Sequence, residues 1–185
     1  MRRGKPSWRQ LRKRSEELLE GLAVPDPFDL DEFAAAVGRR RGKPIRVVDV
    51  SPSRGELLTV GGGGATMCGL LLQFAGEDII VVEARDWVHR VHVGLHEIAH
   101  LECGHLGRHP PMSALRLFPD LDESMVRGVF GRTGYSEVQE REAEGLASLL
   151  SARLIGRSGL PARRAQGDDQ VMARLERAIG GTTEC

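Results

Sequence analysis

Apolar and polar residues recur along the chain with two different periods, and the change of period separates helical from extended segments. Near the N-terminus the apolar residues return every three or four positions, which is the spacing of one helix face. This spacing predicts a helix from Ser7 to Leu22, with Ser7 as its N-cap. A second helix is predicted from about Asp29 to Val37, with Gly38 and the run Arg39–Arg41 closing it.

The middle of the chain changes to short runs of β-branched residues and leucines, separated by turn residues. Such runs are typical of strands, and they predict an antiparallel sheet of three or four strands. The candidate strands are Ile45–Val50, Leu57–Val60, Met67–Phe74 and Asp78–Val82. The glycine run Gly61–Gly64 is followed by a strand pattern and not by a helix, so we expect a hairpin loop and not a phosphate-binding loop.

The helical period returns in the second half of the chain. It predicts a helix from Trp87 to about Glu102, which Gly104 would stop, and a longer helix that Ser136 caps and that runs to Ile155. A short helix around Asp122–Phe130 and a final helix after Pro161 are weaker expectations. The fold class predicted is α+β in a single domain of residues 1–185, with an N-terminal basic helix over 1–23 and a C-terminal helix and tail over 156–185.

Composition and charge restrict the class of protein. The chain has 185 residues, 41% of them hydrophobic and 28% charged, and its formal net charge is zero. A neutral total gives no reason to expect direct nucleic-acid or membrane binding. Basic residues are nevertheless concentrated before residue 15 and acidic ones follow. The pattern fits a solvated first helix, and the alternative is an arm that binds phosphate or a partner.

The cysteines and apolar runs bear on the compartment. Cys68, Cys103 and Cys185 are odd in number and widely spaced, so they do not form a disulfide framework, and no C-x-x-C pair suggests a thiolate zinc site. The first thirty residues lack the apolar segment of a signal peptide, and no apolar run is long enough to span a bilayer. These features together predict a cytoplasmic protein.

The segment His96-Glu97-Ile98-Ala99-His100 carries the candidate chemistry. On a helix, residues four apart differ in direction by only about 40°, so both imidazoles can bind one Zn²⁺. Glu97 is turned by about another 60°, which suits a general base acting on a water molecule at the metal better than a ligand. The alternative interpretation is two surface histidines and a glutamate that forms a salt bridge.

A hydrolytic zinc site needs a third protein ligand and one open position. The extended metzincin pattern would place glycine and histidine where Cys103 and Leu106 stand, so that pattern fails. Cys103 is expected to be a buried thiol. His105 stays open as a ligand, whereas His109, beside two prolines, is expected at the surface.

The downstream helix offers another source of the third ligand. Of its three central glutamates, Glu142 lies closest to the apolar stripe, at about 60° from its centre, with Glu140 at about 100° and Glu144 at about 140°. A carboxylate at the margin of a buried face can enter a cleft, whereas one on the far side is solvated. This reasoning favours Glu142 and leaves the other two as alternatives.

At these positions the chain resembles the ImmA/IrrE family of metallo-endopeptidases, which are gluzincin-like proteins. That family joins an H-E-x-x-H helix to a downstream helix that reads roughly E-x-E-A-[ND]-x-F-A. The corresponding segment here begins Glu140-Arg141-Glu142-Ala143-Glu144, and the resemblance covers about residues 24–155. Glu144 stands where asparagine or aspartate is usual, and Leu146 stands where phenylalanine is usual.

The resemblance implies roles for individual residues. His96, His100 and Glu142 would be the zinc ligands and Glu97 the general base, although Mn²⁺ or Fe²⁺ accept similar ligands. Two auxiliary candidates come from the residues and not from the resemblance. Tyr135, the only tyrosine, lies one or two turns before Glu142 and is a candidate donor to the oxyanion, with a hydrophobic neighbour of the helix N-cap as the alternative. His105, just past Gly104, is the other auxiliary candidate.

The resemblance also implies an intracellular regulatory endopeptidase whose protein substrate is a separately encoded DNA-binding repressor. The alternatives are a metal-containing or toxin-like module that regulates a partner by association, and a structural metal site with a fourth ligand such as His105 or Cys103. The oligomeric state, the substrate and the activating signal do not follow from the sequence.

Overall fold

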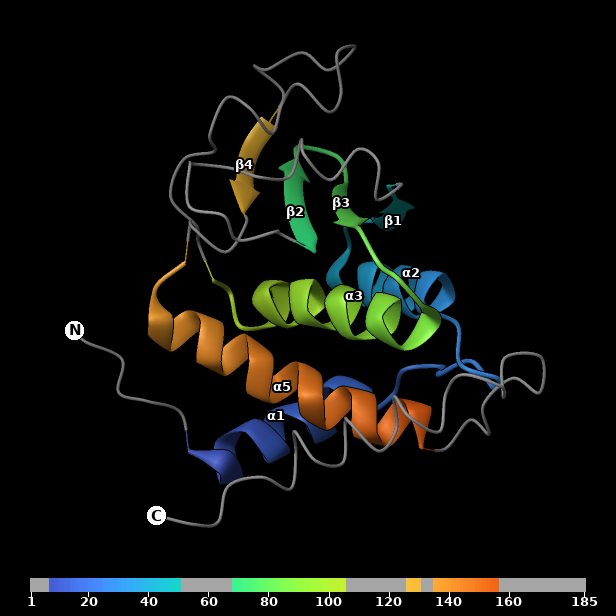
Figure 1. The fold of residues 1–185 in the computed structure, drawn as a ribbon, viewed down its shortest axis with the longest axis vertical. Helices are drawn as coiled ribbons and strands as arrows, with labels where there is room; N and C mark the ends of the chain where they lie inside the picture. Colours follow the sequence, from blue (N-terminus) through green and yellow to red (C-terminus); the bar gives the residue numbers. More distant parts are fainter. Residues whose placement is uncertain (1–6, 51–67, 106–125, 131–134, 157–185) are drawn as a thin grey trace.

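Four helices and a small mixed sheet make up the part of the chain that the computed structural model describes, residues 7–50, 68–105, 126–130 and 135–156 (Figure 1). The α+β class predicted from the sequence is therefore confirmed. The elements in chain order are α1 (Trp8–Leu19), α2 (Leu30–Arg41), β1 (Ile45–Asp49), β2 (Gly69–Phe74), β3 (Asp78–Val82), α3 (Trp87–Glu102), β4 (Val126–Phe130) and α5 (Glu137–Ile155).

The sheet has the strand order β1-β3-β2-β4. β2 and β3 form an antiparallel pair in which Gly69 lies opposite Val82, and β4 pairs antiparallel with the other edge of β2. β1 runs parallel to β3, so the expectation of a purely antiparallel sheet was wrong. The reason is that β1 does not pair with the next strand in sequence but joins the far edge of the β2–β3 hairpin, and local sequence patterns do not encode that choice.

One predicted helix is a strand. The segment Asp122–Phe130 was expected to be a short helix, but Val126–Phe130 is β4. The open edge of β2 provides hydrogen-bond partners for this short stretch, and tertiary context then overrides a weak local preference. The predicted strand Leu57–Val60, the loop Gly61–Gly64 and the helix after Pro161 lie outside the described residues.

The helix starts follow the capping residues of the sequence. Ser7 and Ser136 each form a capping box with a glutamine three residues later, and Asp29 accepts a hydrogen bond from a backbone N–H of α2. The predicted end of α2 was wrong, because the helix continues past Gly38 and ends at Gly42, whose φ is +70°. Gly38 serves close packing instead, since a Cβ there would lie 2.7 Å from the backbone nitrogen of Ile45.

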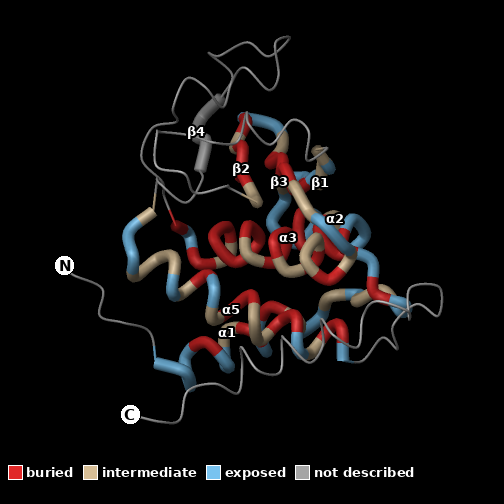
Figure 2. The backbone as a smooth tube through the Cα atoms, in the orientation of Figure 1, coloured by how far each residue is buried: buried red, intermediate tan, exposed pale blue. Residues whose placement is uncertain are grey.

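α3 lies between the sheet and α5, and this arrangement places the H-E-x-x-H segment inside the molecule (Figures 1 and 2). One side of α3 packs on β2 and β3 and the other on α5, while α1 covers the outer side of α5. Val91, Leu95 and Ile98 of α3 are fully buried. Because α3 has neighbours on both sides, its polar residues lie between packed elements and not on an open surface. No helix among the described residues is long and apolar enough to cross a membrane.

Candidate metal centre

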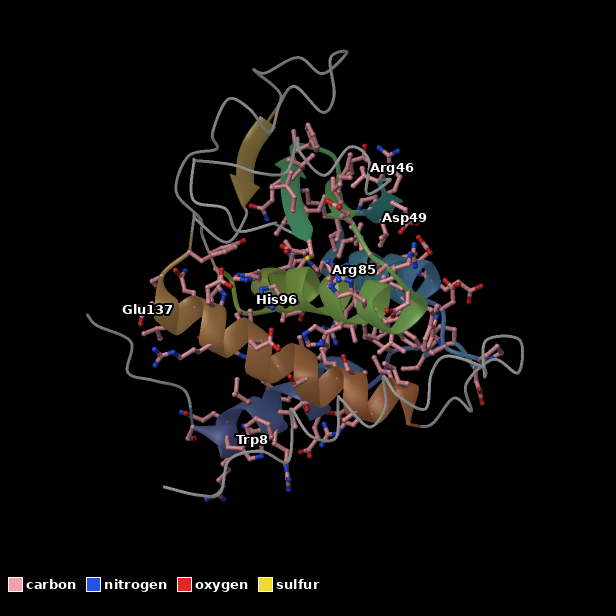
Figure 3. The ribbon with its side chains drawn as sticks, viewed as in Figure 1. Trp8, Arg46, Asp49, Arg85, His96 and Glu137 are labelled. Carbon is pink, nitrogen blue, oxygen red and sulfur yellow. The ribbon has the colours of Figure 1, made fainter. Side chains whose placement is uncertain are left out.

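The two histidines of the H-E-x-x-H segment point toward the same place. His96 and His100 lie one turn apart on α3, and both approach Glu140 of α5, as their four-residue spacing on a helix predicted. Figure 3 shows His96 between the two helices. Their Nε2 atoms are 3.0 Å apart. Two ligands of a tetrahedral zinc ion, each bonded at 2.0–2.1 Å, would be separated by about 3.3 Å. The two nitrogens are therefore close to the spacing that one metal ion needs.

Glu140 of α5 supplies the third candidate ligand. One of its carboxylate oxygens is 3.5 Å from His96 Nε2 and the other, Oε1, is 3.8 Å from His100 Nε2. Oε1 is buried and has no hydrogen-bond partner, which is an unfavourable state for a carboxylate oxygen unless a cation is nearby. The three residues offer ligand atoms that all lie within 4.8 Å of one another. Two imidazoles and one carboxylate are a donor set that zinc accepts, so the residues fit a metal ion.

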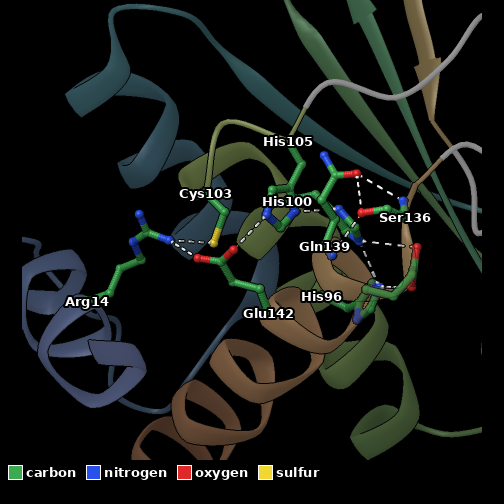
Figure 4. A network of polar contacts seen from close by, with 9 residues as sticks. Arg14, His96, His100, Cys103, His105, Ser136, Gln139 and Glu142 are labelled. Atoms are coloured by element: carbon green, nitrogen blue, oxygen red, sulfur yellow. Dashed lines mark hydrogen bonds and ion pairs between the residues drawn. The ribbon is translucent and has the colours of Figure 1, made fainter. Parts of the chain in front are cut away.

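Glu142, which the sequence favoured as the third ligand, lies elsewhere. It groups with Cys103 and His105 on the other side of His100 and pairs with Arg14 of α1 (Figure 4). The sequence-based choice of Glu142 was wrong because of how α5 is packed. The apolar stripe of α5 packs against α1 as well as α3, so its centre points between two neighbours and not at the metal site. Glu140, farther from that centre, is the residue that faces the histidines.

Glu144, which lies on α5 one turn after Glu140, contacts the ring of His96. One of its carboxylate oxygens is 3.2 Å from His96 Nδ1, and the other is 3.1 Å from Nε2 of His92. These hydrogen bonds to His92 and His96 hold the pKa of Glu144 well below its usual range. Glu144 stands where asparagine or aspartate is usual in the family that the chain resembles, and its longer side chain reaches both rings. An anchored Nδ1–H leaves the Nε2 atom of His96 directed at the metal position.

The two candidate ligand histidines differ sharply in proton affinity. Burial alone would lower the pKa of His96, but hydrogen bonds to Glu140 and Glu144 and the charge of Glu97 raise it to about 10. Burial, and then the neighbouring rings of His96 and His105, lower the pKa of His100 to about 2. Near neutral pH, His96 is thus an imidazolium whose Nε2–H can donate to the bare Nε2 of His100. A metal ion would replace that shared proton.

Glu97, the candidate general base, is held against the sheet. Its residue is only 5% exposed, and its carboxylate lies beside Gly69, where a Cβ would come within 2.6 Å of Glu97 Oε1. β2 therefore approaches α3 this closely because residue 69 has no side chain. Glu97 and both motif histidines line a cavity of about 90 Å³, so the carboxylate reaches the space next to the candidate metal position without being grouped with the ligands.

The two auxiliary residues expected from the sequence both lie at this site. Tyr135 stacks on His100, with ring centroids 3.6 Å apart and planes inclined by 19°, and it lines the same cavity. Burial and the charges of Glu97 and Glu140 raise its pKa, so it stays a neutral hydroxyl. His105 lies behind His100, with the Nδ1 atoms of the two rings 3.1 Å apart.

His105 and Cys103 do not complete a closed four-ligand zinc site with the motif histidines. Cys103 is 4% exposed and belongs to the group on the far side of His100, as does His105. Cys103 is therefore buried, as expected, and burial raises the pKa of its thiol to about 11. The geometry therefore favours an open site over a structural one. His109 lies outside the described residues.

The sequence left Glu140 only as an alternative to Glu142, and two contributors were not singled out at all: His92 as a partner of Glu144, and Arg14 as a partner of Glu142. A signal for Glu140 was present, because Glu140 and Glu144 repeat on α5 the four-residue spacing of the two motif histidines. Two such pairs on facing helices can meet along one line of contact.

Comparison of the sequence with protein-family models and with curated proteins finds no match. The resemblance to the ImmA/IrrE family accordingly stays a prediction from the motifs. What can be stated of the site comes from its geometry: two imidazoles, one buried carboxylate with an unsatisfied oxygen, and a second carboxylate beside a cavity.

Proposed function

We propose that this chain is a zinc-dependent endopeptidase of the gluzincin-like type, in which His96, His100 and Glu140 hold the metal and Glu97 is the general base. The observation that carries the proposal is the convergence of Glu140 with both motif histidines. Mn²⁺ or Fe²⁺ would accept the same ligands. Zinc is the favoured ion because the set of two histidines and one glutamate recurs at catalytic zinc sites of peptidases.

When bound, the ion would lower the pKa of a water molecule and polarise the carbonyl of the scissile peptide bond. Glu97 accepts the proton from the attacking water and returns it to the leaving amine. Its place beside Gly69 fixes the direction of the carboxylate. Tyr135 keeps its hydrogen at working pH, because its pKa is raised, and can donate to the developing oxyanion.

The substrate class rests on the family resemblance. We propose a protein substrate, and specifically a separately encoded helix-turn-helix repressor, so that cleavage would regulate transcription in the cytoplasm. The cavity of about 90 Å³ has room for several water molecules and for the reacting atoms. It adjoins an open hollow lined by His96, Arg141 and Gly145, among others, and this hollow offers room for the rest of a peptide.

The test compares the wild type with Glu97→Gln and with Glu102→Gln, a matched control one and a half turns farther along α3, whose carboxylate pairs with Arg40 and Arg41. Each protein is loaded with zinc and incubated with a proteome-derived peptide library and with a repressor encoded beside its gene. Products are read by mass spectrometry. We expect all three proteins to bind zinc, and cleavage by the wild type and Glu102→Gln but not by Glu97→Gln.

Cleavage by Glu97→Gln at the wild-type rate would remove Glu97 from the mechanism. A zinc-loaded wild type that cleaves neither the library nor the repressor would refute the peptidase proposal. The alternative function is regulation of a partner by binding alone. This alternative predicts that the wild type and Glu97→Gln relieve repression equally in a reporter assay.

A further inference from the structure

A chain of polar contacts leads from His100 away from the metal position to helix α1 (Figure 4). His100 Nδ1 is 3.1 Å from His105 Nδ1, and His105 Nε2 is 3.3 Å from Glu142 Oε2. The other oxygen of Glu142 accepts a hydrogen bond from Arg14. The side chains of His100 and His105 are 1% and 2% exposed, and that of Glu142 is 14% exposed. His100, His105 and Glu142 thus form a largely buried line that ends at Arg14, whose side chain is 38% exposed.

The turn after α3 places His105 in this line. Gly104 has a φ of +61°, a value that favours glycine, and it reverses the chain at the end of the helix. The backbone N–H of His105 then donates to the carbonyl of His100 at 3.0 Å. This backbone contact brings the His105 ring edge-on to the His100 ring, at a centroid distance of 5.0 Å.

The direction of each hydrogen bond follows from what each group can donate. A carboxylate only accepts, so the hydrogen between His105 and Glu142 belongs to His105 Nε2. In a neutral ring the opposite nitrogen, Nδ1, then carries a lone pair. That lone pair can be satisfied by His100 only if the His100 hydrogen lies on Nδ1. His100 is thereby left with a bare Nε2, which is the atom that faces His96 and Glu140.

We propose that His105 and Glu142 are positioning residues that hold His100 in the tautomer with hydrogen on Nδ1, so that its Nε2 is free to bind the metal. This inference deepens the proposed function and rests on it. Glu142 acts through His105, and His105 acts through His100. Glu144 has the corresponding place behind His96, with the difference that it contacts Nδ1 of that ring directly.

The ligand atoms of Cys103, His105 and Glu142 also lie within 4.8 Å of one another. A second metal ion is not favoured there, because the guanidinium of Arg14 already provides a positive charge at this group. This guanidinium donates to Glu142 and, at 3.2 Å, to the sulfur of Cys103. The cation of this cluster is therefore supplied by α1. Arg14, one of the basic residues near the N-terminus, therefore has a structural role. It pairs with one oxygen of Glu142 while the other oxygen contacts His105.

The first experiment compares two substitutions at residue 105. His105→Asn keeps an acceptor, because the Oδ1 of asparagine occupies nearly the position of histidine Nδ1, whereas His105→Leu removes it. Zinc affinity is measured by competition with a chromophoric chelator, and circular dichroism with thermal unfolding confirms that each variant is folded. We expect His105→Leu to bind zinc about 10- to 100-fold more weakly than the wild type and His105→Asn to stay within a few-fold. Equal affinities for a folded His105→Leu and the wild type would overturn the proposal.

The second experiment places Glu142→Ala in the wild type and in His105→Asn. In the wild type Glu142→Ala should weaken zinc binding about 10-fold or more. It should have little further effect in His105→Asn, because the asparagine acceptor needs no partner to fix its hydrogen. Equal losses in both backgrounds would show that Glu142 acts independently of His105 and would overturn the proposed chain.

The tautomer itself separates this inference from the proposed function. Nitrogen NMR of protein labelled at histidine distinguishes hydrogen on Nδ1 from hydrogen on Nε2, and it also identifies a ring that carries both hydrogens. We expect the Nδ1–H form in the wild type and a smaller fraction of it in His105→Leu. A wild type that binds no zinc but has this dependence would refute the metal site and support the positioning role. An Nε2–H form in the wild type would refute the positioning role whatever the zinc affinity.

Discussion

Replacing Gly69 with alanine tests the contact between β2 and the candidate general base. A Cβ at this position would lie 2.6 Å from Glu97 Oε1 and 2.8 Å from Val93 Cγ1, whereas ordinary van der Waals contact begins near 3.4 Å. The carboxylate would have to move by about 0.8 Å, since Gly69 is fixed by its strand partners. Crowding of this kind in a packed interior costs about 2 kcal/mol in the free energy of unfolding. A displacement near 1 Å at a catalytic group can lower the rate about 100-fold.

The assay follows unfolding, zinc affinity and cleavage in Gly69→Ala and in the control Gly76→Ala, whose added Cβ would meet nothing within 4 Å. For a chain of this size, about 2 kcal/mol corresponds to a fall in Tm of roughly 4–8 °C. We expect that fall and the loss of cleavage in Gly69→Ala only, with zinc affinity nearly unchanged, because the ligands lie on α3 and α5. A Gly69→Ala protein with the wild-type Tm and cleavage rate would refute the close approach of Glu97 to β2.

Four further predictions address a ligand, the proton at the site (in two measurements) and the sheet. Glu140→Gln should weaken zinc binding more than 100-fold, beyond the loss of about 10- to 100-fold that removal of a supporting residue such as Glu142 causes; the opposite order in chelator competition would restore Glu142 as the ligand. Because the pKa of His96 is raised to about 10, zinc must displace a proton from this ring to bind. The affinity for zinc should therefore rise about tenfold per pH unit between pH 6 and 8. An affinity that does not change with pH would contradict a protonated His96. For the same reason, protonation of His96 stabilises the zinc-free protein fully below about pH 6.5, and chemical denaturation should show this contribution declining as pH rises toward 10. Lys43→Ala removes the ion-pair partner, at 2.5 Å, of the fully buried Asp78. It should lower the free energy of unfolding by about 3 kcal/mol. A decrease below about 0.5 kcal/mol in denaturant titration would contradict that pairing.

The helices and the core of the site followed closely from local sequence patterns. α3 begins and ends where its apolar period and Gly104 predicted, and α5 begins at its serine cap. These features are encoded locally, because caps and turns involve residues only a few positions apart. The placement of His96 and His100 on one face of a helix is of the same kind, since it needs only the four-residue spacing.

The errors share a different origin. Gly38 read as a helix stop but instead permits close contact with Ile45, which comes from the next strand. The parallel pairing of β1 with β3 and the strand at Val126–Phe130 depend on which edges of the sheet are free. The two strand pairings join segments far apart in sequence, and the Gly38 contact depends on how the chain turns back after α2, so helix periodicity and single stop residues do not predict them.

The choice between Glu140 and Glu142 shows where sequence reasoning reaches its limit at this site. The sequence by itself determined that two imidazoles share a helix face and that a second helix carries a glutamate to meet them. Only the tertiary structure decided which glutamate it is, because the rotation of α5 about its axis is set by packing against α1 and α3 together. That rotation turns Glu140 toward the histidines and Glu142 toward Arg14 and His105. A helix buried on two sides has no single inward direction, and its sequence alone does not state which neighbour each side meets.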